Sequence, residues 1–266
     1  SFQHARNALD LDRRHIADGP AALAITMRRS CRDTAQVRRL HHMLKPHARA
    51  IQPVDDLAAL AHTHGALFLC DAVQGFGRMA MPAGADMIAV SAHKIHGPKG
   101  IGALWVRDGV ALEPLLHGGG QEGGLRSGTL SPALCAGFGA AAVLAKARMA
   151  EDAAHVSALW DAAMDMLPAG WAINGSTSAR YKGNFNIRMS RLDVARLMSE
   201  VRGVAFSAGS ACASGSGRPS HVLSALGLAP TDVKSSIRIG FGRYTSEKEL
   251  RDGLSAIFAA ADAQTG

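Results

Sequence analysis

The sequence is poor in aromatic residues and in long apolar runs, and each shortage excludes a class of protein. Three Trp and two Tyr offer little surface for stacking on bases, and no nucleic-acid-binding motif is present, so no nucleic-acid partner is expected. No apolar run approaches the roughly 20 residues that span a bilayer. The first residues lack the basic and then apolar order of a signal peptide. We therefore expect a soluble, cytoplasmic protein without a membrane partner.

Cysteine is also scarce, and its spacing excludes two kinds of site. The chain has four cysteines, none of which forms a C-x-x-C pair or stands at zinc-finger spacing. Free thiols are therefore expected, and no metal site is predicted. Cys70 and Cys135 lie in apolar or alanine-rich surroundings and are expected in the core. Cys212 differs, because all its neighbours are small.

The residues that are present suffice for a folded protein with one large core or two linked cores. The chain has 266 residues, 47% of them hydrophobic, so a sizeable core can be buried. The formal net charge is +7, and basic residues concentrate in the segment 28–50. A positive balance is compatible with an anionic cofactor or an acidic partner.

Helical and strand patterns alternate in the first half of the chain. Residues 55–65 show helical spacing after two acidic residues. The short apolar runs 66–70 and 86–91 are typical of strands buried on both faces, and 102–106 follows as another strand. This alternation predicts an α/β fold with a mainly parallel sheet. Two helices, over 131–149 and 151–166, are expected to follow. Short strands and helices beyond them predict a smaller α+β domain, so the domains are placed at 1–145 and 146–266.

Two residues at predicted strand ends have the chemistry of a cofactor site. Lys94 follows the strand 86–91 and precedes a glycine-rich loop, where ligands of open α/β sheets bind. A lysine there can form a Schiff base with an aldehyde, although most lysines are simply solvated. Asp71 ends the strand 66–70 and can bind a pyridine nitrogen, or it can cap a helix or a turn. These alternatives stay open on the residues alone.

Several ordered motifs together resemble one family. They are Asp71-Ala-Val-Gln74, Ser91-Ala-His-Lys94, Gly97-Pro-Lys-Gly100, Gly118-Gly-Gly-Gln-Glu122, Leu125-Arg-Ser-Gly-Thr129, Ser207-Ala-Gly-Ser-Ala-Cys-Ala-Ser214, Ser235-Ser-Ile-Arg238 and Gly242-Arg-Tyr-Thr245. In this order they resemble the pyridoxal-phosphate (PLP) enzymes of class V aminotransferase type, and within that class the cysteine desulfurases of iron–sulfur assembly and nitrogen fixation. The resemblance runs from about Ile51 to the C-terminus. It implies a PLP-dependent transferase fold, with an incomplete large domain and a small C-terminal domain.

The resemblance also implies a role for each matched residue. Lys94 would hold PLP covalently and move the substrate's α-proton. Asp71 would pair with the pyridine nitrogen and Gln74 with the phenolic oxygen. The remaining implied roles are the phosphate ligands Ser91 and His93, Thr129 toward the cofactor of a neighbouring subunit in a homodimer, and Arg238 as the clamp for the substrate carboxylate.

Cys212 is implied to be the second catalytic residue. It stands among small residues from 208 to 216, which cannot pack a core and are typical of an exposed loop. An exposed thiol can become the nucleophilic thiolate. It would take the sulfur of L-cysteine as a persulfide, release L-alanine, and pass the sulfur to an acceptor such as an iron–sulfur scaffold protein.

The sequence departs from the family pattern before Ile51. The family's glycine–threonine phosphate loop and its histidine that stacks on the PLP ring are not found. The segment 28–50 matches nothing in the family, and it is interpreted as a frameshift, as the mark of a truncated gene, or as a basic surface insertion. Two other functions therefore remain: another class V lyase or aminotransferase, such as selenocysteine lyase, and a catalytically silent homologue that binds a partner or carries sulfur.

Overall fold

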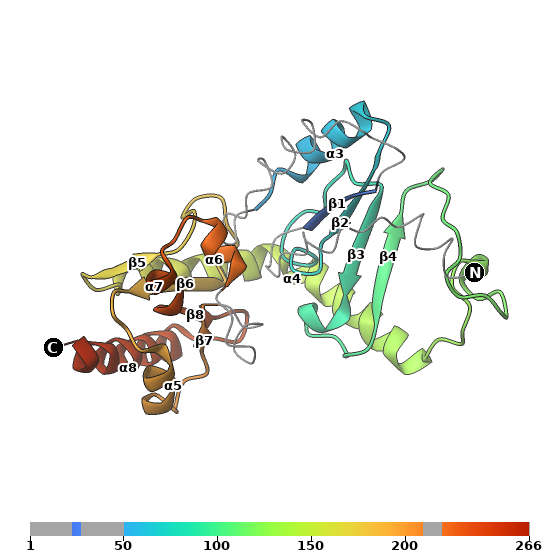
Figure 1. Ribbon diagram of the computed structural model, residues 1–266. Helices are drawn as coiled ribbons and strands as arrows, with labels where there is room; N and C mark the ends of the chain where they lie inside the picture. The colour runs from blue at the N-terminus through green and yellow to red at the C-terminus, as the bar shows by residue number, and fades with distance from the viewer. Residues whose placement is uncertain (1–22, 28–50, 210–219, 266) are drawn as a thin grey trace. The chain divides into compact units, whose positions relative to one another are not determined.

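The computed structural model describes residues 23–27, 51–209 and 220–265 (Figure 1). Contacts divide the chain into two compact units. Among the described residues, the first holds 23–27 and 52–149, and the second holds Ile51 and 150–265. The division falls inside one long helix.

The first unit is built on a four-stranded sheet in the order β1-β2-β3-β4. β2 and β3 are parallel, whereas β1 is antiparallel to β2 and β4 is antiparallel to β3. The sheet is thus mixed rather than mainly parallel. The connection 92–101 is shorter than the dozen residues that a parallel crossover needs, so β4 returns antiparallel. The elements are β1 (Leu23–Met27), α3 (Val54–Thr63), β2 (Leu67–Asp71), β3 (Met87–Ser91), the 3-10 helix η2 (Ala92–Ile95), β4 (Gly102–Val106), the 3-10 helix η3 (Glu122–Gly124) and the first part of α4 (Pro132–Asp165).

Local sequence explains α3 and β2. Asp55 and Asp56 lie in the first turn of α3, where negative charge favours the positive end of the helix dipole. The chain turns after α3 at Gly65, whose φ of 64° suits a residue without a Cβ atom. Phe68 and Cys70, alternate residues of β2, are fully buried, as expected for one face of a strand. The predicted helix and strand are therefore confirmed, but the predicted burial of the strand on both faces was wrong, because only one face of β2 is fully buried.

Helix α4 (Pro132–Asp165) is continuous, so the prediction of two helices over 131–149 and 151–166 was wrong. No glycine or proline stands at residues 149–151 to end the first helix. Among the described residues, α4 is the one helix that is long and apolar enough to cross a membrane, by length and composition only.

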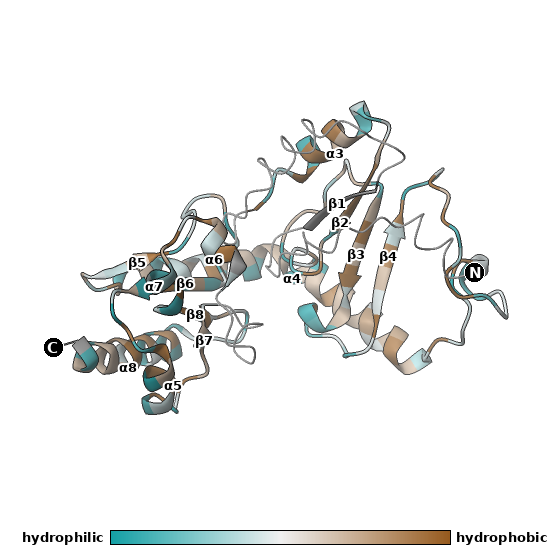
Figure 2. Cartoon of the chain, in the orientation of Figure 1, coloured by the Kyte–Doolittle hydropathy of each residue, from teal (hydrophilic) through white to brown (hydrophobic). Residues whose placement is uncertain are grey.

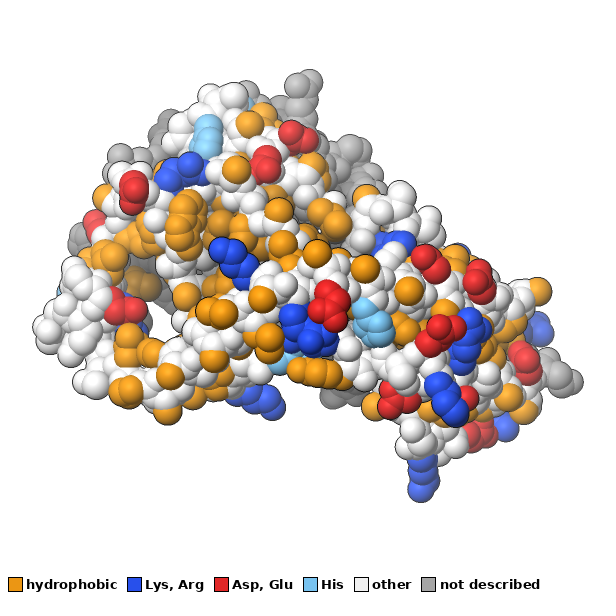
Figure 3. Space-filling model, turned by 180° about the vertical axis from the view of Figure 1, so that it is seen from behind, with side chains coloured by type: hydrophobic (Ala, Val, Ile, Leu, Met, Phe, Trp, Pro, Cys, Tyr) orange, Lys and Arg blue, Asp and Glu red, His pale blue; other side chains and the backbone are white. Residues whose placement is uncertain are grey.

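The first unit exposes several large apolar side chains. The space-filling view shows hydrophobic side chains gathered on the face drawn (Figure 3). Consecutive residues of β4, Leu104 and Trp105, are each about half exposed, and consecutive strand residues point to opposite faces of a sheet. Both faces of this edge strand are therefore accessible to solvent. The other large exposed apolar residues of this unit are Leu67, Leu115, Leu116, Leu125, Leu130, Val143 and Leu144.

The second unit has the α+β organisation predicted for the C-terminal part. Its antiparallel sheet has the order β5-β6-β8-β7. Phe185, Ile187 and Ile237 are fully buried and belong to one apolar core together with the helical residues Leu159 and Ile257, along the brown stretches of Figure 2. The elements are β5 (Trp171–Ile173), β6 (Asn184–Met189), α5 (Val194–Glu200), β7 (Ser207–Ala208), α6 (His221–Ala225), α7 (Pro230–Lys234), β8 (Ser236–Gly240) and α8 (Glu247–Thr265).

The two faces of this sheet differ because side chains alternate along each strand. Between the core residues of β6 and β8 stand Asn186, Arg188, Ser236 and Arg238. The register pairs Asn186 with Arg238, and Arg188 with Ser236. Directly opposed residues of an antiparallel pair share a face, so this face of the sheet is polar.

Candidate active site

The residues predicted to hold a cofactor gather at the carboxyl ends of β2 and β3. These strands are parallel neighbours, with Asp71 paired to Ala89. Asp71 is the last residue of β2. Ser91 is the last residue of β3, and Lys94 lies in η2, which follows at once. The ends of parallel strands are where open α/β sheets bind ligands, so the fold brings these candidates to one edge of the sheet.

Arg78, which the sequence patterns did not single out, joins two of these candidates. Its Nη1 donates to Gln74 Oε1 at 3.0 Å, and its Nη2 donates to the backbone oxygen of Lys94 at 3.0 Å. The one local signal was a basic residue four positions after Gln74. The bond to Lys94 spans 16 positions of sequence, and no local pattern reports it.

The side chain of Asp71 caps the turn after β2, which is one of the two roles that the sequence allows. Its Oδ1 accepts from the backbone N–H of Val73 at 3.0 Å, which holds the turn after β2. A carboxylate has two oxygens and about four acceptor positions. One oxygen in the turn therefore leaves acceptor capacity for a ligand, and the two roles are compatible.

The two residues predicted to bind a phosphate are in contact with each other. Ser91 Oγ and His93 Nδ1 are 2.8 Å apart, and His93 is exposed. Thr129 is also exposed, and no hydrogen bond of its side chain is found within the described ranges. The first unit thus brings Asp71, Gln74, Ser91, His93 and Lys94 to one edge of its sheet, and the structure gives no such link for Thr129.

The cysteines of the first unit differ in exposure. Cys70 is fully buried, and burial, followed by the negative charges of Asp71 and Asp55, raises its pKa to about 12. It is therefore protonated at neutral pH and is a poor nucleophile, in line with the core position predicted. Cys135 is partly exposed, so its predicted burial was wrong. Because α4 leaves much of its surface uncovered, this cysteine is not enclosed.

In the second unit, Arg238 lies on the polar face of the sheet. It is partly buried, and it stands opposite Asn186 of β6 and Ser207 of β7. Cys212 lies outside the described residues. The described chain ends at Gly209 before it and resumes at Ser220 after it. These two residues are the described ends on either side of the Cys212 segment.

A buried polar network holds Gly209 in place. Asn186 Nδ2 donates to the Gly209 carbonyl at 3.0 Å, and the Gly209 N–H donates to the Ser236 carbonyl at 2.7 Å. Asn174 Nδ2 donates to Asn186 Oδ1 at 2.7 Å and to Ser236 Oγ at 3.0 Å. Both asparagines are 1% exposed. The sequence patterns missed this network, because its members come from distant segments.

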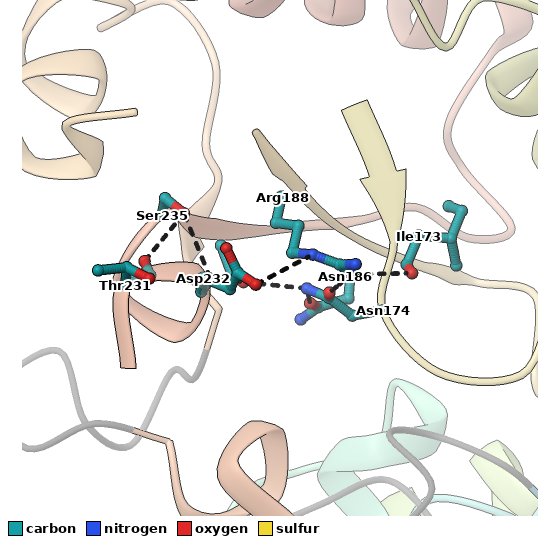
Figure 4. A network of polar contacts seen from close by, with 8 residues as sticks. Ile173, Asn174, Asn186, Arg188, Thr231, Asp232 and Ser235 are labelled. Carbon is teal, nitrogen blue, oxygen red and sulfur yellow. Dashed lines mark hydrogen bonds and ion pairs between the residues drawn. The ribbon is translucent and has the colours of Figure 1, made fainter. Parts of the chain in front are cut away.

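The network extends to Arg188 and Asp232 (Figure 4). Arg188 Nη1 donates to Asn174 Oδ1 at 2.6 Å, and its Nε lies 4.0 Å from Asp232 Oδ2. Both polar atoms of the Asn174 side-chain amide thereby have partners, which is what a buried amide requires. The strand end that precedes the Cys212 segment is therefore fixed to the sheet on its polar face.

Comparison with known proteins decides the family. The profile of the family described as aminotransferase class-V matches residues 44–252. The chain belongs to the class-V aminotransferase family. The fold class predicted from the sequence is confirmed by a solved NifS-like protein from Rickettsia africae, with a TM-score of 0.72 and 27% identity over 81% of this chain and 59% of that one.

Two other similar proteins have a name or title that mentions cysteine. A protein of Saccharomyces cerevisiae named "Cysteine desulfurase, mitochondrial" is 44% identical over 214 residues, which is 78% of this chain and 43% of that protein. A solved structure entitled "SspA in complex with cysteine" is 33% identical with a TM-score of 0.62, over 75% of this chain and 57% of that one. The chain spans about half the length of the curated relatives it matches.

Proposed function

We propose that this class-V chain is, or forms part of, a PLP-dependent cysteine desulfurase, which moves the sulfur of L-cysteine to Cys212 and releases L-alanine. The observation that carries the proposal is the cluster at the ends of β2 and β3, where Lys94 and Asp71 lie and where Arg78 is bonded to both Gln74 and Lys94. Similarity to proteins named cysteine desulfurase gives the cluster its chemical context.

The residues of the cluster fit the functional groups of PLP. The Lys94 amine suits the aldehyde, the Asp71 carboxylate suits the protonated pyridine nitrogen, and the Gln74 amide suits the phenolic oxygen. Ser91 and His93 supply a hydroxyl and a ring nitrogen for the phosphate. When bound, PLP supplies an electron sink for the bonds around the substrate's Cα atom.

Three residues of the chain then act on the substrate. Arg238 binds the carboxylate of L-cysteine through its planar guanidinium group, and the Lys94 amine carries the proton taken from Cα. The Cys212 thiolate attacks the substrate's sulfur. An S–S bond forms as the C–S bond breaks, the electron pair stays with Cβ, and Cβ takes a proton. The proton taken from Cα is returned to Cα. The products are L-alanine and a persulfide on Cys212, so no external oxidant or reductant is consumed.

The proposal includes partners and a place in the cell. Thr129 reaches the cofactor of a second subunit in a homodimer, and the persulfide is handed to an acceptor such as an iron–sulfur scaffold protein. We propose a cytoplasmic location, although two of the relatives are named as mitochondrial.

Two substitutions test the function. The chain is incubated with PLP and L-cysteine, and alanine and the persulfide of Cys212 are measured by mass spectrometry. Lys94→Ala should abolish both, because only a primary amine attaches the cofactor covalently, and borohydride reduction of the unmodified chain should label Lys94. Cys212→Ser should abolish the persulfide. Label on Lys99 or Lys182, or full alanine release by the Cys212→Ser variant, would refute the proposal.

A further inference from the structure

Arg78 is hydrogen-bonded to two residues of the predicted cofactor cluster. Besides Gln74 Oε1 and the Lys94 carbonyl, each at 3.0 Å, its Nη1 lies 3.5 Å from the Gln74 carbonyl. The side chain is partly buried. A guanidinium group has five N–H donors in a fixed fork, and here the fork joins the turn after β2 to the turn after β3.

The segment that carries Arg78 is held close to the Lys94 turn by Gly77. This glycine has a φ of 70°, and a Cβ atom at its position would lie 2.8 Å from Ala145 Cβ and 2.9 Å from Ile95 Cγ2. Both distances are shorter than real contacts of a Cβ atom. Only glycine permits this close approach. Arg78, the next residue, is therefore held near Ile95, which follows Lys94 in the chain.

The bond to Arg78 sets the orientation of the Gln74 amide. Arginine can only donate, so the carboxamide must turn its oxygen toward Arg78 and its NH₂ group away. The phenolic oxygen of PLP is an acceptor and needs a donor. Arg78 therefore orients the Gln74 amide so that its NH₂ group can donate to the phenolic oxygen. In the reversed orientation, the NH₂ group of Gln74 would face the N–H groups of Arg78.

We infer that Arg78 is a positioning residue, which orients the Gln74 amide and fixes the backbone of Lys94 for cofactor binding. The inference rests on the proposed function, since it assumes that Gln74 and Lys94 hold PLP. Lysine cannot replace arginine here, because one ammonium group on a flexible stem does not reproduce two fixed bonds. A catalytic group that moves by about 1 Å can lose on the order of 100-fold in rate.

The test compares Arg78→Lys and Arg78→Ala with Arg107→Lys. Arg107 is a matched control, because its Nη2 also donates to two backbone carbonyls, those of Ala83 and Ala85. These carbonyls precede the start of β3, whereas the cofactor cluster follows its end. Cofactor dissociation is measured by titration with PLP, covalent attachment by borohydride labelling of Lys94, and folding by circular dichroism. Loss of one charge-assisted hydrogen bond should weaken PLP binding about tenfold in the Arg78 variants and leave it unchanged in Arg107→Lys.

A spectroscopic signature separates positioning from a general loss of structure. If Gln74 no longer donates to the phenolic oxygen, that oxygen holds a proton more strongly, so the visible band of bound PLP should titrate at higher pH in the Arg78 variants. In a Gln74→Ala background, the substitution Arg78→Ala should cost less affinity than in the unmodified chain.

The outcomes distinguish the two proposals. If borohydride does not label Lys94 in the unmodified chain, the proposed function fails and this inference fails with it. If Lys94 is labelled but the folded Arg78→Lys variant keeps the PLP affinity and the band titration of Arg107→Lys, the positioning role is overturned and the function stands. The positioning role would also be overturned if Arg78→Ala reduced PLP affinity equally in the unmodified chain and in the Gln74→Ala background.

Discussion

Arg243 and Asp152 form an ion pair that ties the segment after β8 to helix α4. Arg243 Nε donates to Asp152 Oδ2 at 2.8 Å, and its Nη2 bonds the same oxygen. The two side chains are 7% and 18% exposed. The hydrogen bond that Arg243 donates to Asp152 outweighs burial and raises the pKa of Arg243. The nearby His155 Nε2 bonds the Thr245 carbonyl at 2.9 Å, so this corner of the second unit is held by two side-chain contacts.

We expect Asp152→Ala to destabilise the second unit strongly. Removal of one partner leaves a buried guanidinium group with less compensation, at a cost of about 3 kcal/mol. Urea denaturation measures the loss. Asp161→Ala is the matched control on the same helix, because Asp161 is 66% exposed and pairs with Lys182, and exposed pairs contribute little. Equal losses in the two variants would contradict the importance of burial here.

Asp86 makes the stability of the first unit dependent on pH. Its buried carboxylate accepts from His62 Nε2 at 2.8 Å and from the Phe68 N–H at 2.7 Å, and Arg107 Nε lies 3.5 Å away. Burial alone would raise the pKa of Asp86, but the bonds from His62 and Phe68 and the charges of His62 and Arg107 together lower it below 3.8.

A carboxylate whose pKa is lower in the folded state stabilises that state above its unfolded pKa and loses this contribution as the pH falls. We therefore expect the urea midpoint to decrease below about pH 4. Asp86→Asn should flatten this decrease and lower the midpoint at neutral pH. The control Asp56→Asn, at an exposed position of α3, should keep the acid slope, and a slope unchanged in Asp86→Asn would remove Asp86 as its cause.

The Asn186 network should stabilise the chain on the side where the Cys212 segment begins. Asn186→Ala leaves the Gly209 carbonyl and the Asn174 amide each short of a buried partner, which costs about 1–3 kcal/mol. Urea denaturation of the second unit reports the loss. Asn184→Ala is the control from the same strand, since Asn184 Oδ1 makes no hydrogen bond within the described ranges. A larger loss in the control would show that the network does not carry this stability.

Local patterns predicted the elements that bear the candidates. The apolar runs before Asp71 and Lys94 are visible in sequence as strands, and β2 and β3 confirm these elements. The roles of these residues stay predictions. The family resemblance, carried by ordered motifs, is confirmed by the profile match over 44–252.

What the sequence did not reveal depends on distant contacts. Arg78 contacts a residue 16 positions away, and Asn174 contacts Ser236 across 62 positions, so neither bond leaves a periodic pattern. The direction of β4 follows from the length of its connection rather than from its residues. The single helix α4 arises because no glycine or proline stands at 149–151, so the two predicted helices continue into one.

Asp71 offers the sharpest separation of structure from chemistry. Its Oδ1 holds the N–H of Val73 in the turn after β2, and its proposed second role is to accept from the protonated pyridine nitrogen of PLP. Asparagine keeps one oxygen for Val73 and replaces the other with an NH₂ group, which donates and cannot accept. Asp71→Asn should therefore preserve the turn while removing the contact with the cofactor.

We expect Asp71→Asn to keep the urea midpoint of the unmodified chain and the borohydride label on Lys94. Alanine release from L-cysteine should fall on the order of 10- to 100-fold, as the loss of one hydrogen bond to a charged group implies. Asp71→Ala, which loses the bond to Val73 as well, should reduce both activity and stability. If Asp71→Asn releases alanine at the unmodified rate, the Asp71 carboxylate has only its role in the turn.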